Sequence, residues 1–163
     1  MIHHRRRASS PSYTLCAPEE VAKLKQRRFA RDAMGNWLRC RAWEHFLTLT
    51  TVGRISSGGL LRHFRTHYVR RLASVARQGV AWFAVVERTP GGQLHLHALT
   101  AGTAAVTETE LERHWVLGIG EAQSYSADRR GPEYITKTLG CIEAHDCWDL
   151  SWREARLVST ELP

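Results

Sequence analysis

Two histidines separated by a single leucine, His95-Leu96-His97, have the clearest potential for metal chemistry in this chain. They fall in an apolar run over 94–101 that predicts a β-strand. Side chains alternate between the two faces of a strand, so both imidazoles lie on one face and Leu96 lies on the other. Two neutral imidazoles at this spacing can bind one divalent cation.

Glu87 is the candidate third ligand, because it ends the apolar run over 81–87 that predicts the preceding strand. A three-residue loop at 90–92 would pair Glu87 with His95 on the same face of the hairpin. A two-residue loop at 91–92 would instead aim the carboxylate at the opposite face, unless a bulge restored it. Histidine and carboxylate ligands together favour Mn²⁺ or Mg²⁺ with open positions for phosphate oxygens.

Tyr134 and Lys137 form a second pair of residues with potential for chemistry. Residues 131–133, Gly-Pro-Glu, are typical of a helix start, and Gly140 is typical of a helix end. Residues three apart share a helix face, so the phenol and the ammonium lie together. A phenol is a poor nucleophile until a metal, a cation or a base stabilises its phenolate. A phosphate polarised by a divalent metal is a suitable electrophile for it.

The remaining elements must position these side chains. We expect helices at 18–36, 60–77, 107–115 (short and capped) and 131–140, and strands at 45–52, 81–87, 94–101 and 121–127. Turns are expected at 56–59 and at 89–92, where the second turn joins the second and third strands. The tail after residue 140 gives no clear pattern. This order predicts an α+β fold of about five antiparallel strands with helices packed on the sheet, of the ferredoxin-like or RRM-like kind.

The charge distribution favours a polyanionic partner. The chain has 23 Lys and Arg against 16 Asp and Glu residues, a net charge of +7 and a pI near 9.7. The positive excess lies in the first half, and the second half is net acidic. Basic surfaces of this kind bind nucleic acid because they release the counterions condensed on phosphates. The candidate contacts with the DNA backbone are basic residues of the two long helices: Arg28, Arg31, Arg62, Arg65 and Arg70.

Length and hydropathy limit the architecture and the location. A chain of 163 residues is about one domain, which we divide into a basic arm at 1–17 and a single domain at 18–163 without a helicase. The longest apolar run, at 80–86, is far below the roughly 20 residues that span a bilayer, so we expect no membrane association. The start of the chain is basic with no apolar stretch behind it, which favours a cytoplasmic location.

Taken together, these motifs resemble those of the HUH (His-hydrophobic-His) endonucleases, specifically the rolling-circle replication initiators. That family has a β-strand motif, a metal-binding histidine pair and a helix bearing Tyr-x-x-Lys. Here the three motifs are 46–51 (FLTLTT), 95–99 (HLHAL) and 134–137 (YITK), in the family's order. The resemblance covers residues 43–140. It departs from the family at Thr138, where a second nucleophilic tyrosine is absent.

The resemblance implies a function for each residue of the site. His95, His97 and Glu87 would bind Mn²⁺ or Mg²⁺, and Tyr134 would attack a DNA phosphodiester to form a covalent 5′-phosphotyrosine. Lys137 would stabilise the phenolate and the negative charge at phosphorus. The substrate would be single-stranded DNA or an origin hairpin of a plasmid or phage, and a separate host helicase would be a partner. Trp37, Trp43 or Trp82 could stack on bases, although core packing is the favoured interpretation for Trp82.

Three other functions remain open from the sequence. An HUH transposase of an insertion element would share the fold and the chemistry. A non-catalytic RRM-like module would bind nucleic acid with His95 and His97 as ordinary strand residues. A metal-dependent hydrolase would use water and would not need Tyr134.

Overall fold

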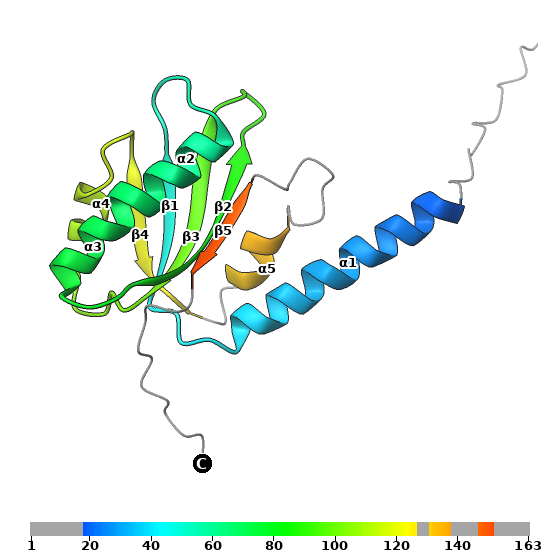
Figure 1. The fold of residues 1–163 in the computed structure, drawn as a ribbon, viewed down its shortest axis with the longest axis horizontal. Helices are drawn as coiled ribbons and strands as arrows, with labels where there is room; N and C mark the ends of the chain where they lie inside the picture. Colours follow the sequence, from blue (N-terminus) through cyan, green and yellow to red (C-terminus); the bar gives the residue numbers. More distant parts are fainter. Residues whose placement is uncertain (1–17, 127–130, 138–146, 152–163) are drawn as a thin grey trace, which may run out of the picture.

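Five antiparallel strands form one sheet in the order β4-β1-β3-β2-β5 (Figure 1). The computed structural model describes residues 18–126, 131–137 and 147–151. The strands are β1 (His45–Thr50), β2 (Ala81–Arg88), β3 (Leu94–Ala101), β4 (Gly120–Ser124) and β5 (Trp148–Ser151). The helices are α1 (Pro18–Arg39), α2 (Ser57–His63), the π-helix η1 (Phe64–Tyr68), α3 (Val69–Ala76), α4 (Glu108–Arg113) and α5 (Gly131–Thr136).

The element order from β1 to β4 confirms the expected fold class. One strand and a helical segment precede the β2–β3 hairpin, and a helix and a strand follow it. This βαββαβ order with β3 between β1 and β2 is the ferredoxin-like arrangement. A fifth strand, β5, lies in the tail, where the sequence did not distinguish a strand from a helix, and pairs with β2 at the sheet edge.

One face of the sheet is covered by α2, η1 and α3, which cross in front of the strands in Figure 1. Helical residues at spacings of three and four, such as Leu61, Phe64, Tyr68 and Leu72, point into this core, as the 3.6-residue period requires. They pack on the even-numbered residues of β3, including Leu96. This face therefore forms the main hydrophobic core, and the odd-numbered histidines of β3 are excluded from it.

The opposite face of the sheet is covered by α5 and the end of α1. Leu38 of α1 and Ile135 of α5 are both fully buried there, against Phe83 of β2 and Leu99 of β3. Leu99 lies on the same face as His95 and His97 because it is separated from them by an even number of residues. The start of α1 extends away from the sheet (Figure 1). The face that carries the histidines is thus the one over which α5 is positioned.

Several element boundaries differ from the prediction. The turn expected at 56–59 is wrong, because the Ser56 hydroxyl accepts a hydrogen bond from Gly59 N–H and so caps a helix that begins at Ser57. The uninterrupted helix expected over 60–77 contains the π-helical turn η1. There the Thr66 hydroxyl donates to the Arg62 carbonyl at 2.7 Å, where an α-helix would use the backbone N–H of residue 66.

Smaller differences concern element ends. Helix α1 continues three residues beyond 36, β1 stops before the Thr51–Val52 segment, and β4 runs from 120 to 124. The short helix α4 has the expected capping box between Thr107 and Glu110 and ends at Arg113. The arm at 1–17, the end of the last helix at Gly140 and most of the tail lie outside the described residues.

A search of the described residues found no helix whose length and apolar character would let it cross a membrane.

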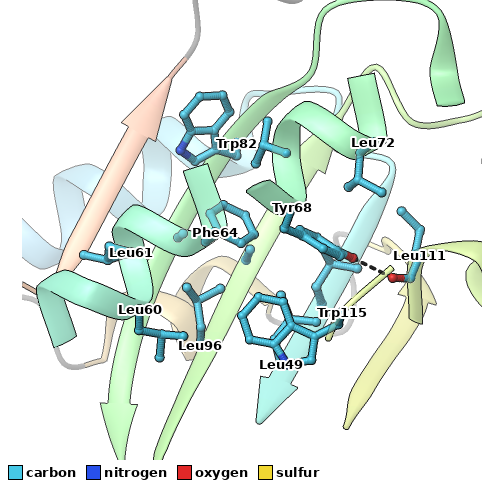
Figure 2. Packing of buried hydrophobic residues seen from close by; sticks show 14 of the residues in the cluster. Leu49, Leu60, Leu61, Phe64, Tyr68, Leu72, Trp82, Leu96, Leu111 and Trp115 are labelled. Atoms are coloured by element: carbon cyan, nitrogen blue, oxygen red, sulfur yellow. Dashed lines mark hydrogen bonds between the residues drawn. The ribbon is translucent and has the colours of Figure 1, made fainter. Parts of the chain in front are cut away.

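The buried tyrosine of the main core gives a prediction of stability. The Tyr68 hydroxyl is buried and donates to the Leu111 carbonyl at 2.9 Å (Figure 2). The hydroxyl of Tyr125, in contrast, is buried with no hydrogen-bond partner among the described residues. Tyr68→Phe should lower the free energy of unfolding by about 1–2 kcal/mol, whereas Tyr125→Phe should be nearly neutral. Urea unfolding followed by circular dichroism measures both, and equal losses would contradict the hydrogen-bond assignment.

Candidate metal centre and adjoining cavity

The register of the β2–β3 hairpin places Glu87 directly opposite His95. The Thr89 N–H donates to the Gln93 carbonyl at 2.8 Å, and the Gly92 N–H donates to the Thr89 carbonyl at 2.8 Å. Gly92 has a φ of 84°, which suits the left-handed residue of a three-residue hairpin loop. The three-residue loop, and with it the Glu87–His95 pairing, is confirmed, and the two-residue alternative is wrong.

Glu87, His95 and His97 converge on a point above the sheet. The Glu87 Oε2 atom lies 3.4 Å from His95 Nε2 and 3.6 Å from His97 Nε2. One potential ligand atom from each of the three residues lies within 4.8 Å of the others. Ligands bound to a single ion at about 2.0–2.2 Å must lie about 3–4.4 Å apart, so the spacing is close to what one divalent cation requires.

The hydrogen bonding of these side chains is incomplete in the way a metal site requires. Glu87 and His97 are only 8% and 4% exposed. Yet Glu87 Oε1 and His97 Nε2 are buried and have no hydrogen-bond partner among the described residues. Buried polar atoms are normally paired because leaving them unpaired is unfavourable. These residues therefore fit a bound divalent cation.

Thr48 orients one of the candidate ligands. It lies opposite His97 in the β1–β3 register, and its Oγ1 atom is 3.2 Å from His97 Nδ1. An Nδ1–H that donates to Thr48 leaves the Nε2 lone pair free for a metal. Burial, then the charges of His95 and Lys137, lower the pKa of His97 to about 4. The imidazole is therefore neutral at pH 7, as a metal ligand must be.

Tyr134, on the short helix α5, lies against the candidate metal centre. Its ring is perpendicular to that of His97, with the ring centroids 5.1 Å apart. The fully buried Ile135 anchors the helix in the core, while Tyr134 itself stays 45% exposed. Tyr134 is therefore next to the cluster and open to a ligand from solvent.

Lys137 links the tyrosine to the carboxylate. Its Nζ atom is 3.0 Å from Glu87 Oε2 and lies over the Tyr134 ring, 3.7 Å from the centroid. Burial alone would lower the pKa of Lys137, but hydrogen bonds to Tyr134 and Glu87 raise it above its ordinary value. The ammonium is thus held in its charged form next to the phenol. The Glu87-His95-His97 set and the Tyr134-Lys137 pair, which were predicted from separate motifs, therefore form one group of five side chains.

A cavity of about 650 Å³ adjoins this group. It lies between β1, the end of β4 and α5, and its surface is mostly apolar. His97, Tyr134 and Lys137 form its boundary with the candidate metal centre. The other residues that line it are Phe46, Thr48, Gln123, Ser124, Tyr125, Ser126 and Gly131.

The arginines expected to contact DNA are divided between the two faces of the sheet. Arg62, Arg65 and Arg70 belong to the α2–η1–α3 run, on the face opposite His95, because the apolar side of this run packs on the other face of β3. The structure does not bring them together with the cluster. Arg28 and Arg31 lie on α1, and both are within 4 Å of Asp32. Arg31 and Thr136 line a common hollow, so Arg31 lies near α5, the helix that carries Tyr134.

Two of the three tryptophans expected to stack on bases are not accessible. Trp43 and Trp82 are each only 5% exposed because they pack in the two hydrophobic cores. Trp37 is half-buried, and the guanidinium of Arg41 lies 4.5 Å from its ring. The core packing expected for Trp82 is therefore confirmed, and stacking by Trp43 is a wrong expectation.

Sequence reasoning did not identify Thr48, Phe46, Tyr125 or Gly131 as parts of the site. A signal for Thr48 was present, because threonines at alternate positions of 46–51 must share a face with the histidines of the neighbouring strand. Tyr125 and Gly131 come from other segments, and only the folded chain places them beside β1.

Comparison of the chain with protein-family models, with curated proteins and with solved structures found no match. The resemblance to the HUH endonucleases therefore stays a prediction.

Metal binding by the folded protein tests the cluster directly. We expect His97→Ala to abolish measurable Mn²⁺ binding in titration calorimetry, because it removes a ligand. Thr48→Val should weaken the affinity about tenfold, because it leaves the imidazole without its orienting partner. Thr66→Val, which removes a hydroxyl on the opposite face, is the control and should bind Mn²⁺ normally. Wild-type affinity in His97→Ala would exclude this metal centre.

The lowered pKa of His97 predicts a pH dependence of stability in the metal-free protein. The unfolded chain takes up a proton near the ordinary pKa of 6.5, whereas the folded chain does so only near 4. Between these values the unfolded state binds more protons, so stability falls as the pH falls, by up to about 1.4 kcal/mol per pH unit. Above pH 6.5 this contribution is constant.

Urea unfolding in a chelator from pH 7.5 to 4 measures this slope. His97→Gln should flatten it relative to the wild type. Identical slopes in the two proteins would show that His97 is not held in its neutral form.

Proposed function

We propose that this protein is a metal-dependent, single-tyrosine DNA endonuclease and strand-joining enzyme of the HUH kind, acting as a rolling-circle replication initiator. The proposal depends mainly on one observation: a partly exposed phenol and an ammonium lie against a buried Glu-His-His cluster with unpaired ligand atoms. A nucleophile, a cation and a candidate metal centre around one cavity are the components that phosphodiester cleavage requires.

The chemical step follows from the positions of these groups. The Tyr134 oxygen forms a bond to phosphorus, and the bond from phosphorus to the 3′ oxygen of the upstream nucleotide breaks. The phenol proton is transferred, through solvent, to the departing 3′ oxygen, so the products are a 5′-phosphotyrosine and a 3′-hydroxyl. Because the phosphodiester is exchanged and not hydrolysed, the reverse step rejoins strands.

Each residue has a distinct part in this step. Lys137 stabilises the phenolate and the charge at phosphorus, since its ammonium lies over the Tyr134 ring, 3.7 Å from the centroid. His95, His97 and Glu87 would hold Mn²⁺ or Mg²⁺, which would polarise the scissile phosphate. Thr48, as an acceptor for an Nδ1–H of His97, would favour the tautomer whose Nε2 is free.

A DNA substrate is supported by the positive charge of the chain and by its distribution. Arg31 on α1 lines a hollow together with Thr136 of α5, the helix that carries Tyr134. We therefore propose Arg31, and Arg28 one turn before it, as contacts with the backbone of a single strand or an origin hairpin. Arg62, Arg65 and Arg70 could contact DNA only where it continues to the other face. A cytoplasmic location and a separate host helicase belong to the same proposal.

Lys137 favours an initiator over a transposase within this class, because the resemblance is to initiators with a lysine one turn after the tyrosine. The threonine at position 138 supports a single-tyrosine cycle. Binding of nucleic acid by an RRM-like module would not require a buried carboxylate next to two histidines.

Covalent capture of DNA tests the proposed activity. The protein is incubated with Mn²⁺ and a randomised single-stranded DNA labelled at its 3′ end, and the products are separated by denaturing electrophoresis. We expect a labelled protein band for the wild type, and its loss in Tyr134→Phe and in His97→Ala. Thr66→Val, which removes a hydroxyl on the opposite face of the sheet, should retain the band.

The other outcomes identify the alternative functions. Cleavage without a labelled protein band, retained in Tyr134→Phe, would show hydrolysis by water. DNA binding with neither cleavage nor adduct would show a non-catalytic module.

A further inference from the structure

The cavity beside the candidate metal centre is larger and less polar than a site for a phosphate group needs to be. Its volume of about 650 Å³ falls in the range of about 300–1,000 Å³ typical of pockets for organic ligands. Its boundary with His97 and Tyr134 means that a group bound in the cavity would be adjacent to a phosphate held at the metal centre.

Aromatic rings form much of the wall. The Phe46 ring lies against the rings of His97 and Tyr134, with centroid distances of 5.7 Å and 6.2 Å. Tyr125 adds a further ring at the end of β4, where its backbone N–H donates to the Glu44 carbonyl at 2.7 Å. Flat aromatic walls are the surfaces on which unpaired nucleobases stack.

The Tyr125 hydroxyl is a polar group that the protein leaves unsatisfied. It is buried and has no hydrogen-bond partner among the described residues. Burial raises the pKa of Tyr125, so the hydroxyl stays protonated and can both donate and accept.

Gly131 lets the two aromatic rings pack against the start of α5. A Cβ atom at this position would lie 3.3 Å from Cε2 of Tyr125 and 3.6 Å from Cδ2 of Phe46. A larger side chain there would therefore push against Tyr125 and change the shape of the aromatic wall of the cavity.

We infer that the cavity between Phe46, Tyr125 and Gly131 binds one unpaired nucleobase of the DNA strand, next to the phosphate that Tyr134 attacks. The inference rests on the proposed function and extends it, because it assigns the choice of cleavage site to a base pocket and not to the arginines. Stacking on the rings of Phe46 and Tyr125 holds the base by its faces, and the shape of the cavity limits which base fits.

Binding selection tests the pocket separately from the chemistry. The full chain carrying Tyr134→Phe, with Mn²⁺ present, is used to select bound strands from a randomised single-stranded DNA pool. We expect a strong base preference at one position. In fluorescence anisotropy with the selected strand, an abasic site at that position should weaken binding about tenfold or more.

Gly131→Val should weaken binding of the selected strand by a similar factor, and combining it with the abasic strand should give no further loss, because both changes remove one interaction. The matched control is Gly58→Val, also in the first turn of a helix, where a Cβ meets nothing within 4 Å. It should leave affinity unchanged. Phe46→Leu, which keeps an apolar side chain, should reduce affinity severalfold even if Gly131→Val fails to fold.

The inference is overturned if the selection gives no base preference, if the effects of Gly131→Val and the abasic site add, or if Phe46→Leu binds normally. These outcomes are distinguishable from failure of the nicking proposal. An adduct formed by the wild type, with a base preference that Gly131→Val leaves intact, removes only the pocket. A preference that depends on Gly131, with no adduct under any condition, supports the pocket and removes the nicking.

Discussion

The pairing of Glu87 with His95 across the β2–β3 hairpin is the constraint on which the candidate site depends. Side chains alternate along a strand, so a shift of the register by one residue would move the carboxylate to the other face of the sheet. There it would enter the apolar core under α2 and α3. The three-residue loop, with Gly92 at a positive φ, therefore decides whether a third ligand is available to the two histidines. The same register aligns Phe83 with Leu99, so the site and the core beneath α5 share one geometric cause.

The second constraint is the position of α5. A helix of six described residues is too short to be stable by itself. It is fixed by the burial of Ile135 against Leu38 and Leu99 and by the ion pair between Lys137 and Glu87. The helix that carries Tyr134 is thus held by apolar packing and by an ion pair with the surface that carries the candidate ligands. The attraction between the opposite charges also keeps the Lys137 ammonium next to the Glu87 carboxylate.

Much of the fold and the local pattern of the site could be predicted from sequence, because both depend on short-range periodicity. The alternation in 94–101 placed His95 and His97 on one face, and the capping box at Thr107 and Glu110 located α4. Strand β5 could not be predicted, because four residues, Trp148–Ser151, carry too little periodicity to distinguish a strand from a loop. The sequence also does not indicate which face of the sheet the arginine-rich α2–η1–α3 run covers, because this depends on how the run packs against β3.

The cavity also could not be predicted from the sequence. Phe46, Tyr125 and Gly131 are far apart in the sequence and have no common motif, so only the packing of β1, β4 and α5 brings them together. Gly131 was interpretable from sequence as a helix start, which is correct but incomplete. Its second property, the absence of a side chain between two rings, becomes visible only when its neighbours are known.

The convergence of Glu87, His95 and His97 on a single cation can be tested most directly by diffraction from crystals soaked in Mn²⁺, with data collected at the manganese absorption edge. The account predicts one strong anomalous peak about 2.0–2.3 Å from a Glu87 carboxylate oxygen and from the Nε2 atoms of both histidines, with the Tyr134 ring beside it. Well-ordered histidines without an anomalous peak between them, at millimolar Mn²⁺ and neutral pH, would contradict it.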